Sequence, residues 1–315
     1  MASFTSANAS KPVLGLSGFP GLEMVHHWIG IPIFSAYLVA TLGNCTILYV
    51  IWTEPGLHQP MYYFLAMLAT TDLGLCLTTV PTVMGVLWFQ LRKVSVYVCI
   101  SQLFIVHSFS FMESAVLFAM AIDRFLAIRF PLRYALLVTS SRVATSGLIL
   151  LLRSTVLLLP LLPFVLQFPY CRDATLSHSY CLHQDLIRLA CANTSFNSLY
   201  ALILIFLTMG SDLLFILISY SLILKAVLGM TSGADGHYKA LGTCVSHVCA
   251  VLVFYVPVLG LSIVHRFGRH ASPLLHVIMG NIYILLPPLM NPIIYSIKTN
   301  QIYSRILRIV SPKSP

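Results

Sequence analysis

Two acidic side chains lie inside long apolar stretches of the sequence. Asp72 falls within 61–87 and Glu113 within 98–122. Two carboxylates in apolar surroundings cannot both stay ionised unless a cation neutralises them. Because hard cations prefer oxygen ligands, Asp72 and Glu113 together predict a cation site. The alternative is a pair of neutral, hydrogen-bonded acids without an ion.

An adjacent acid and base, Asp123 and Arg124, stand at the end of an apolar stretch, in the segment MAIDRFLAIRFPLRY at 120–134. Further arginines follow in what reads as a basic loop broken by Pro131. A charge at mid-bilayer costs about 2.5–3.5 kcal/mol on insertion scales. A single basic residue would be enough to anchor the span to lipid headgroups, whereas Arg124 is preceded by Asp123, which can neutralise its charge. We therefore expect Asp123–Arg124 to have a functional role at this boundary.

Polar residues at helical spacing predict a binding cavity between two helices and a loop. The predicted cavity residues are His107, Ser110 and Ser114 on one helix, Tyr255, Leu259, Ser262 and Arg266 on another, and Gln184 in the loop as a lid. The planar guanidinium of Arg266 matches a carboxylate. The alternatives are that Arg266 reaches outward to lipid headgroups and that His107 bonds to a neighbouring helix.

The elements that position these residues are membrane spans. Hydrophobic residues make up 58% of the 315-residue chain and charged residues only 9%, which excludes a water-soluble domain. A helical span needs about 20 apolar residues. The stretches that qualify are 28–52, 61–87, 98–122, 143–166, 198–228, 238–264 and 273–297. We expect one all-α membrane domain over 28–297, with an extracellular segment 1–27 before it and a cytoplasmic tail 298–315 after it.

Lys and Arg are divided unequally between the two sides of these spans. Ten of them fall on the side of Arg124 and seven on the side of Arg92. The positive-inside rule then places the N-terminus outside and the C-terminus in the cytoplasm, and no cleavable signal peptide is visible in 1–21. The net charge of +9 favours contact with anionic lipid of the inner leaflet. Its scatter over short loops speaks against a nucleic-acid partner.

Cysteine and sequon positions agree with this topology. The cysteines within spans, where a free thiol packs as a small hydrophobe, are Cys45, Cys76, Cys244 and Cys249. Those outside, in the oxidising compartment, are Cys99, Cys171, Cys181 and Cys191. Spacing alone does not choose among their three possible pairings. Asn8 and Asn193 begin outer-side glycosylation sequons, whereas Asn44-Cys45-Thr46 lies within a span and is a chance match.

Ordered motifs cover nearly the whole chain. They are Gly43-Asn44, LHQPMYYFLAMLATTDL at 57–73, the 120–134 segment, SYCLHQD at 179–185, KALGTCVSHV at 239–248 and PPLMNPIIY at 287–295. Together they resemble the odorant receptors of the rhodopsin-like (class A) G-protein-coupled superfamily. The chain is most similar to the class I branch and, within it, to olfactory receptor family 51. Phe125 in place of a common Tyr, and Arg129-Phe130 in place of Cys-His or Cys-Asn, bear on coupling strength and not on class.

This resemblance implies a seven-transmembrane helix bundle in the plasma membrane, followed by a short cytoplasmic amphipathic helix. It implies a receptor for a small water-soluble odorant, a short- or medium-chain carboxylic acid for this branch. Such a receptor activates a stimulatory G protein of the olfactory/Gs type and raises cyclic AMP. No cofactor is required. The cation at Asp72 and Glu113 would be sodium, acting as an allosteric modulator.

The resemblance also implies the disulfides. Cys99 and Cys181 match the bridge of the superfamily, which leaves Cys171 and Cys191 to pair with each other. Each bridge would stabilise the fold by about 2–4 kcal/mol, mostly by limiting the unfolded chain.

An activation switch near the cytoplasmic side follows from the same resemblance. Its members are Asp123, Arg124, Tyr220, His247, Tyr255, Asn291, Pro292 and Tyr295. Pro257 and Pro292 kink their helices and would act as hinges, although kinks are also tolerated in membranes without such a role. By residue type alone, His247 fits a hydrogen-bonded core histidine equally well.

Two other classes of protein place ionisable groups inside a membrane. A transporter or channel for small solutes is the alternative function, but it calls for broken helices in repeated halves, and no such repeat is visible. The chain is not expected to be an enzyme, because HExxH, GxSxG and zinc-ligand spacings are absent from the sequence. Arg153 and Asp212 also lie inside spans, and the sequence assigns a role to neither.

Overall fold

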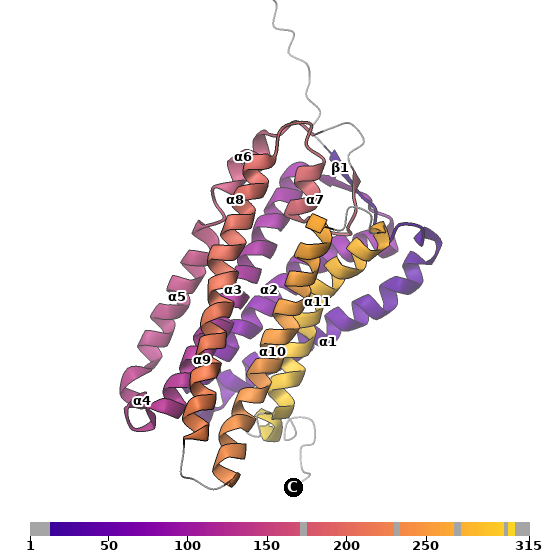
Figure 1. Ribbon diagram of the computed structural model, residues 1–315. Coiled ribbons are helices and arrows are strands. Elements are labelled where there is room, and N and C mark those ends of the chain that lie inside the picture. The colour runs from indigo at the N-terminus through magenta and orange to yellow at the C-terminus, as the bar shows by residue number, and fades with distance from the viewer. Residues whose placement is uncertain (1–12, 171–174, 230–233, 268–271, 299–301, 306–315) are drawn as a thin grey trace, which may run out of the picture.

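The computed structural model describes residues 13–170, 175–229, 234–267, 272–298 and 302–305, without the side chains of 234–241, 243, 266, 267, 297 and 298. Within this part of the chain, seven helical segments are long and apolar enough to cross a membrane. They stand side by side in one elongated bundle (Figure 1). The predicted all-α, seven-span architecture is confirmed.

The spans follow the chain in order. They are formed by α1 (His26–Thr53), α2 (Pro60–Phe89), α3 (Val96–Arg129), α5 (Ser140–Val156) with α6 (Leu161–Gln167), α8 (Ser195–Ile205) with η3 (Phe206–Gly210) and α9 (Ser211–Leu228), α10 (Ala234–Phe267) and α11 (Pro273–Lys298). The connections carry α4 (Pro131–Leu137), α7 (His183–Arg188) and the 3-10 turns η1 (Glu23–Val25) and η2 (Pro55–Leu57).

α3 is the central helix of the bundle. In its most apolar window 67% of the residues are buried, compared with 22% for α1 at the periphery. The peripheral spans leave large apolar side chains exposed on their outer faces, as lipid-facing helices do. Gly43 of the Gly43-Asn44 motif lies against α11: a Cβ at this position would stand 2.9 Å from the Pro292 ring. Glycine here lets α1 and α11 approach closely.

Two spans are interrupted where the sequence suggested continuous helices. The fourth consists of α5 and α6, joined by a turn over 157–160 that ends at Pro160. Proline lacks the N–H that a continuous helix requires. The fifth contains the π turn η3, whose Met209 lines a cavity between the helices. π turns of this length are often found at functional sites.

The region after Asp123 also differs from the prediction. α3 runs to Arg129 and does not end at 122, because most of the residues that follow, among them Arg124, Leu126 and Ala127, are good helix formers. The segment expected as a basic loop contains the short helix α4. Pro131 occupies the first position of α4, where its missing N–H leaves no bond unmade.

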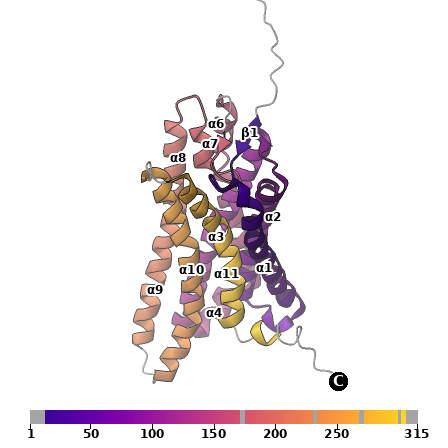
Figure 2. The same ribbon diagram turned by 90° about the vertical axis from the view of Figure 1, so that its right-hand side faces the viewer.

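A small sheet that the sequence did not predict closes one end of the bundle (Figure 2). β1 (Val13–Leu16) pairs antiparallel with β2 (Lys93–Ser95) and parallel with β3 (Thr175–Leu176). Strands of two to four residues are too short to show a period of two in sequence. We call this end, which also carries α7, the sheet end, and the opposite end, which carries α4, the Arg124 end.

The chain continues past α11 with a helical turn over 302–305. Ile302 is buried, and Arg305 forms an ion pair with Glu54 at 3.1 Å. These contacts hold the start of the tail against the connection between α1 and α2. The remaining residues of the expected amphipathic helix and tail, 299–301 and 306–315, lie outside the described residues, so the helix itself stays a prediction.

Candidate functional site

A small cavity of about 80 Å³ opens between the helices near the sheet end. The cavity walls are formed by α3, α7 with the residue before it, α8, η3, α10 and α11. The lining residues are His107, Phe111, Leu182, His183, Gln184, Ile205, Met209, Val258, Leu261, Ser262, His265 and Tyr283. Most of these side chains are apolar, and a few polar groups converge among them. This combination is typical of a small-molecule site.

The polar groups of the cavity are chiefly imidazoles. The His107 and His183 rings meet edge to face with centroids 6.4 Å apart, and His183 Nε2 is held by Asn197 Oδ1 at 2.5 Å. His107 Nε2 is buried and has no hydrogen-bond partner among the described residues. An unmatched buried nitrogen is costly, so a ligand with a polar head group would gain from pairing with it.

The structure brings together some of the predicted ligand residues and separates others. His107, Gln184 and Ser262 line the cavity. Ser110 lies beside the cavity wall and hydrogen-bonds to the hydroxyl of the lining residue Tyr283 at 2.5 Å. Leu259 is half-exposed and lines a neighbouring groove against α8 and η3.

Arg266 was predicted to be the anion-binding residue. It follows His265 directly in α10, one turn after Ser262. Its side chain lies outside the described residues, so its direction stays a prediction.

Ser114 and Tyr255 belong to a hydrogen-bonded network in the membrane interior. Ser114 Oγ donates to Asp212 Oδ2 at 2.9 Å and lies 2.8 Å from the Tyr255 hydroxyl. Arg153 donates two bonds to the Asp212 carboxylate, at 2.9 and 3.0 Å. The network joins α3, α5, α9 and α10, and it gives Arg153 and Asp212 the partners that the sequence did not assign.

The two predicted cation ligands, Asp72 and Glu113, are brought together around Asn291. Asn291 Nδ2 lies 3.0 Å from Asp72 Oδ2 and 3.3 Å from Glu113 Oε1. All three side chains are almost completely buried. The carboxylates of α2 and α3 are therefore brought together beside Asn291-Pro292, as an oxygen-coordinated cation requires. The predicted break at this motif is not observed, because α11 continues as one helix through Pro292.

Some of the predicted switch residues lie towards the Arg124 end, whereas Tyr255 belongs to the network around Ser114 and Asn291 lies between Asp72 and Glu113. Arg124 and Asp123 form an ion pair at 3.8 Å, and Tyr134 of α4 donates to Asp123 at 2.7 Å. Burial, with the hydrogen bond and the charge of Asp123, raises the pKa of the Tyr134 hydroxyl well above its usual range, so Tyr134 remains a donor at neutral pH. Tyr220 and His247 bond at 2.6 Å across α9 and α10.

The disulfide pattern agrees with the prediction where it is described. Cys99 of α3 is bonded to Cys181 in the loop before α7. Cys191 is disulfide-bonded as well, while its expected partner Cys171 lies outside the described residues. The four span cysteines take no part in a disulfide: Cys45, Cys76, Cys244 and Cys249.

Comparison with known proteins decides the family. The family model described as "Olfactory receptor" matches residues 33–313, which is most of the chain. The chain belongs to the olfactory receptor family. It is 53% identical to human Olfactory receptor 51V1, with 98% of this chain and 95% of that protein aligned. It is 54% identical to human Olfactory receptor 51G2, with 96% of each chain aligned.

The fold comparison agrees with this assignment. Squid rhodopsin matches 91% of this chain and 86% of its own with a TM-score of 0.76, at 17% identity, so the olfactory receptor has the rhodopsin fold. As a member of this family it is a multi-pass, odorant-sensing receptor of the cell surface that works through a heterotrimeric G protein. It is not an enzyme, and the transporter alternative is not favoured.

Proposed function

We propose that this olfactory receptor detects a short carboxylic acid, whose carboxylate is bound by Arg266, His107, Ser262 and Gln184. The observation that carries this proposal is the unpaired His107 Nε2, buried in a small cavity whose wall includes Ser262. Donors converge there within apolar surroundings, and Arg266 follows on the same helix. A carboxylate with a short tail matches this arrangement.

The volume of the cavity favours the short end of the acid series. About 80 Å³ leaves room for only a few heavy atoms. The tail would lie against Phe111 and Val258, which line the cavity. The predicted contact with Leu259 would require the ligand to extend towards the neighbouring groove, where Leu259 lies.

Substitution of Arg266 tests the ligand class. A series of straight-chain carboxylic acids and the matched alcohols is applied to cells that express the parent, Arg266→Ala or Arg266→Lys, with cyclic AMP as the readout. A charge-assisted hydrogen bond contributes about 1.5–3 kcal/mol, so the acid should lose roughly one to two orders of magnitude in potency in the Ala variant. Lys should restore only part of it, because an ammonium lacks the bidentate fork.

Arg92→Ala is the matched control, since it removes one basic charge from the sheet end at a residue that does not line the cavity. It should leave the acid response unchanged. Wild-type potency of Arg266→Ala towards every active acid would contradict the carboxylate proposal and leave Arg266 as a headgroup contact. Equal potencies of acids and alcohols in the parent would do the same.

The sheet end is proposed to face the extracellular side. The Cys99–Cys181 disulfide and Asn193 lie at that end, and the larger number of Lys and Arg lies at the other. Residues 1–27, with the sequon at Asn8, would then be extracellular and 298–315 cytoplasmic. Glycosidase treatment tests this orientation, because removal of glycans from Asn8 and Asn193 should increase the electrophoretic mobility of the protein. Substitution of either asparagine should produce part of the same shift.

The Arg124 end is proposed to activate a stimulatory G protein of the olfactory/Gs type. Arg124 would leave Asp123 on activation while α10 pivots near Pro257, and the basic residues around α4 would contact the G protein. The Tyr220–His247 bond between α9 and α10 would change in the same step, together with Tyr295 and the Asn291-Pro292 motif of α11. Tyr255 would link this movement to the cavity, since it bonds to Ser114 below the ligand.

Sodium is proposed as the ion between Asp72 and Glu113. The convergence of both carboxylates on Asn291 supports this proposal. A bound cation offsets the repulsion of two buried acids, and sodium would then favour the arrangement that holds α2, α3 and α11 together. The competing reading, two protonated acids without an ion, predicts no effect of sodium on odorant potency.

A further inference from the structure

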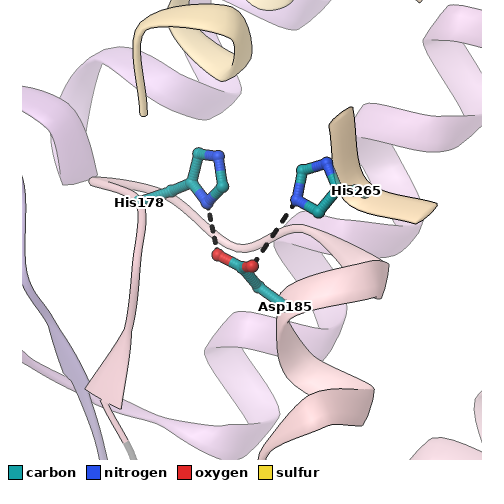
Figure 3. Close-up of side chains that lie close together, drawn as sticks. All are labelled: His178, Asp185 and His265. Atoms are coloured by element: carbon teal, nitrogen blue, oxygen red, sulfur yellow. Dashed lines mark hydrogen bonds and ion pairs between the residues drawn. The ribbon is translucent and has the colours of Figure 1, made fainter. Parts of the chain in front are cut away.

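A second group of polar side chains lies above the odorant cavity, where the loop before α7 meets α10. His178 follows β3, Asp185 belongs to α7 and His265 to α10; Figure 3 shows both imidazoles turned towards the carboxylate. His178 Nδ1 bonds to Asp185 Oδ2, and His265 Nε2 lies 3.6 Å from Asp185 Oδ1. The three ligand atoms lie within 4.8 Å of one another, and all three residues are buried.

The remaining ring nitrogens identify which atoms carry protons. His178 Nε2 lies 3.0 Å from the carbonyl oxygen of His276, and His265 Nδ1 lies 3.0 Å from that of Leu261. A carbonyl only accepts, so both of these nitrogens must be N–H donors. In a neutral imidazole the other nitrogen then carries a lone pair.

Both lone pairs therefore point at the Asp185 carboxylate, which also only accepts. Neutral imidazoles and an ionised carboxylate leave no hydrogen among the three groups. His265 Nε2 is buried and without a hydrogen-bond partner among the described residues. A hydrogen-bonded or ion-paired cluster therefore needs an added positive charge between these atoms: either a proton, carried by an imidazole or by the carboxyl group, or a metal ion.

We propose that His178 Nδ1, Asp185 and His265 Nε2 bind one divalent transition-metal ion of the zinc type. Two imidazoles with one carboxylate form a ligand set that zinc uses, with a fourth position left for water. Each ligating imidazole already donates its second N–H to a backbone carbonyl, which is how metal-binding histidines are oriented in other proteins. Small side-chain movements bring the three atoms to the required bond lengths of about 2.0–2.2 Å.

The surroundings hold the cluster in place. A Cβ at Gly280 of α11 would stand 2.4 Å from His178 Cδ2, so the imidazole fits only because residue 280 is glycine. Tyr180 donates to the Gly280 carbonyl at 2.6 Å, and Arg188 donates to the His265 carbonyl at 2.6 Å. The loop is thus fixed to α10 and α11 on both sides of Asp185.

The position of the site next to the odorant cavity means that the ion would affect the loop covering the ligand. His265 also lines the odorant cavity, so the ion would tie the loop that covers the ligand to the helix that forms the cavity wall. An ion that binds the folded receptor but not the unfolded chain stabilises the folded state by mass action. The ion would act as a modulator of this lid and not as a cofactor that the receptor needs.

Metal-dependent thermal unfolding tests the site without any odorant. The full receptor is purified without a polyhistidine tag, reconstituted in lipid nanodiscs, stripped with EDTA and titrated with zinc. At about 100 times the Kd the Tm should rise by roughly 5 °C or more. Magnesium at equal concentration should have no effect, because it prefers oxygen ligands. Elemental analysis should find one more zinc per receptor than in Asp185→Asn.

Asp185→Asn and His265→Gln, from two different elements, should each weaken zinc binding at least tenfold. His26→Gln is the control: it removes another buried imidazole at the sheet end, outside the cluster, and should keep the zinc response. A wild-type Tm that is unaffected by zinc but rises as the pH falls overturns the proposal in favour of a protonated cluster. An equal zinc response in wild type and His265→Gln overturns it as well. Neither result depends on the odorant or on G-protein coupling.

Discussion

The ion pair between Arg153 and Asp212 makes a quantitative prediction about the stability of the receptor. The guanidinium donates two bonds to the carboxylate, and Ser114 donates a third. The Arg153 side chain is 28% exposed and that of Asp212 3%, within spans that face lipid. Asp212→Asn removes the negative charge with almost no change of shape and leaves the guanidinium without a counter-charge.

The cost follows from this geometry. Breaking a buried ion pair by removing one partner costs about 3–5 kcal/mol, because the other charge stays buried and unpaired. Since Arg153 is partly exposed, we expect the lower end, about 3 kcal/mol, which matches the insertion cost of an arginine at mid-membrane. Replacement of both residues, Arg153→Met with Asp212→Leu, removes the unpaired charge. The double variant should therefore be about 2–3 kcal/mol more stable than the sum of the single changes.

Thermal unfolding of the purified variants in nanodiscs measures this coupling. A loss of about 3 kcal/mol should lower the Tm by roughly 6–12 °C in each single variant of the cycle, Arg153→Met and Asp212→Leu. The Tm of the double variant should fall by little more than that of one single variant, and by much less than the two shifts added together. Arg142→Met is the matched control: this arginine lies at the beginning of the same span and bonds to the Leu136 and Leu137 carbonyls. Strictly additive single and double variants would refute the reasoning, because the pair would then have no net coupling.

Three further substitutions give separate tests. Glu113→Gln should flatten the fall of odorant potency with rising sodium at constant ionic strength; an unchanged sodium response would leave the protonated-acid reading. Arg124→Ala should reach the surface and bind odorant but fail to raise cyclic AMP, and normal signalling would exclude its ion pair with Asp123 from the switch. Gly280→Ala should cost about 1–3 kcal/mol, seen as a lower Tm, because the new Cβ lies 2.4 Å from His178 and the packed loop must shift; an unchanged Tm would show that the loop yields easily.

Several properties of the receptor could be predicted because their physical signals are local. An apolar stretch of about 20 residues needs no tertiary information to be recognised as a span, and the seven stretches correspond to the seven helical segments. The motifs from Gly43-Asn44 to 287–295 are also local, and they identify the family without tertiary information, as the family match over 33–313 confirms. The limits of α3 and the break before α6 were missed because apolar composition says little about where a helix ends.

The candidate sites were predicted only in part, because contacts between distant residues leave no pattern in the chain. Asp72 and Glu113 could be grouped from the sequence because both are acids within spans, but the amide of Asn291 that bonds to both of them could not be inferred. Arg153 and Asp212 were each recognised as unusual, but a charge inside a span does not name its partner 59 residues away.

The sequence by itself determined the class of this protein: membrane composition, seven spans, the olfactory receptor motifs and the residue types available for ligand binding. Only the tertiary structure decided which of those residues meet. His178 lies in the loop after β3, Asp185 in α7 and His265 in α10, and the fold brings the three side chains together. The reason is physical: helical periodicity and hydrophobicity are short-range properties of a chain, whereas a site is made by side chains that the fold brings together from far apart.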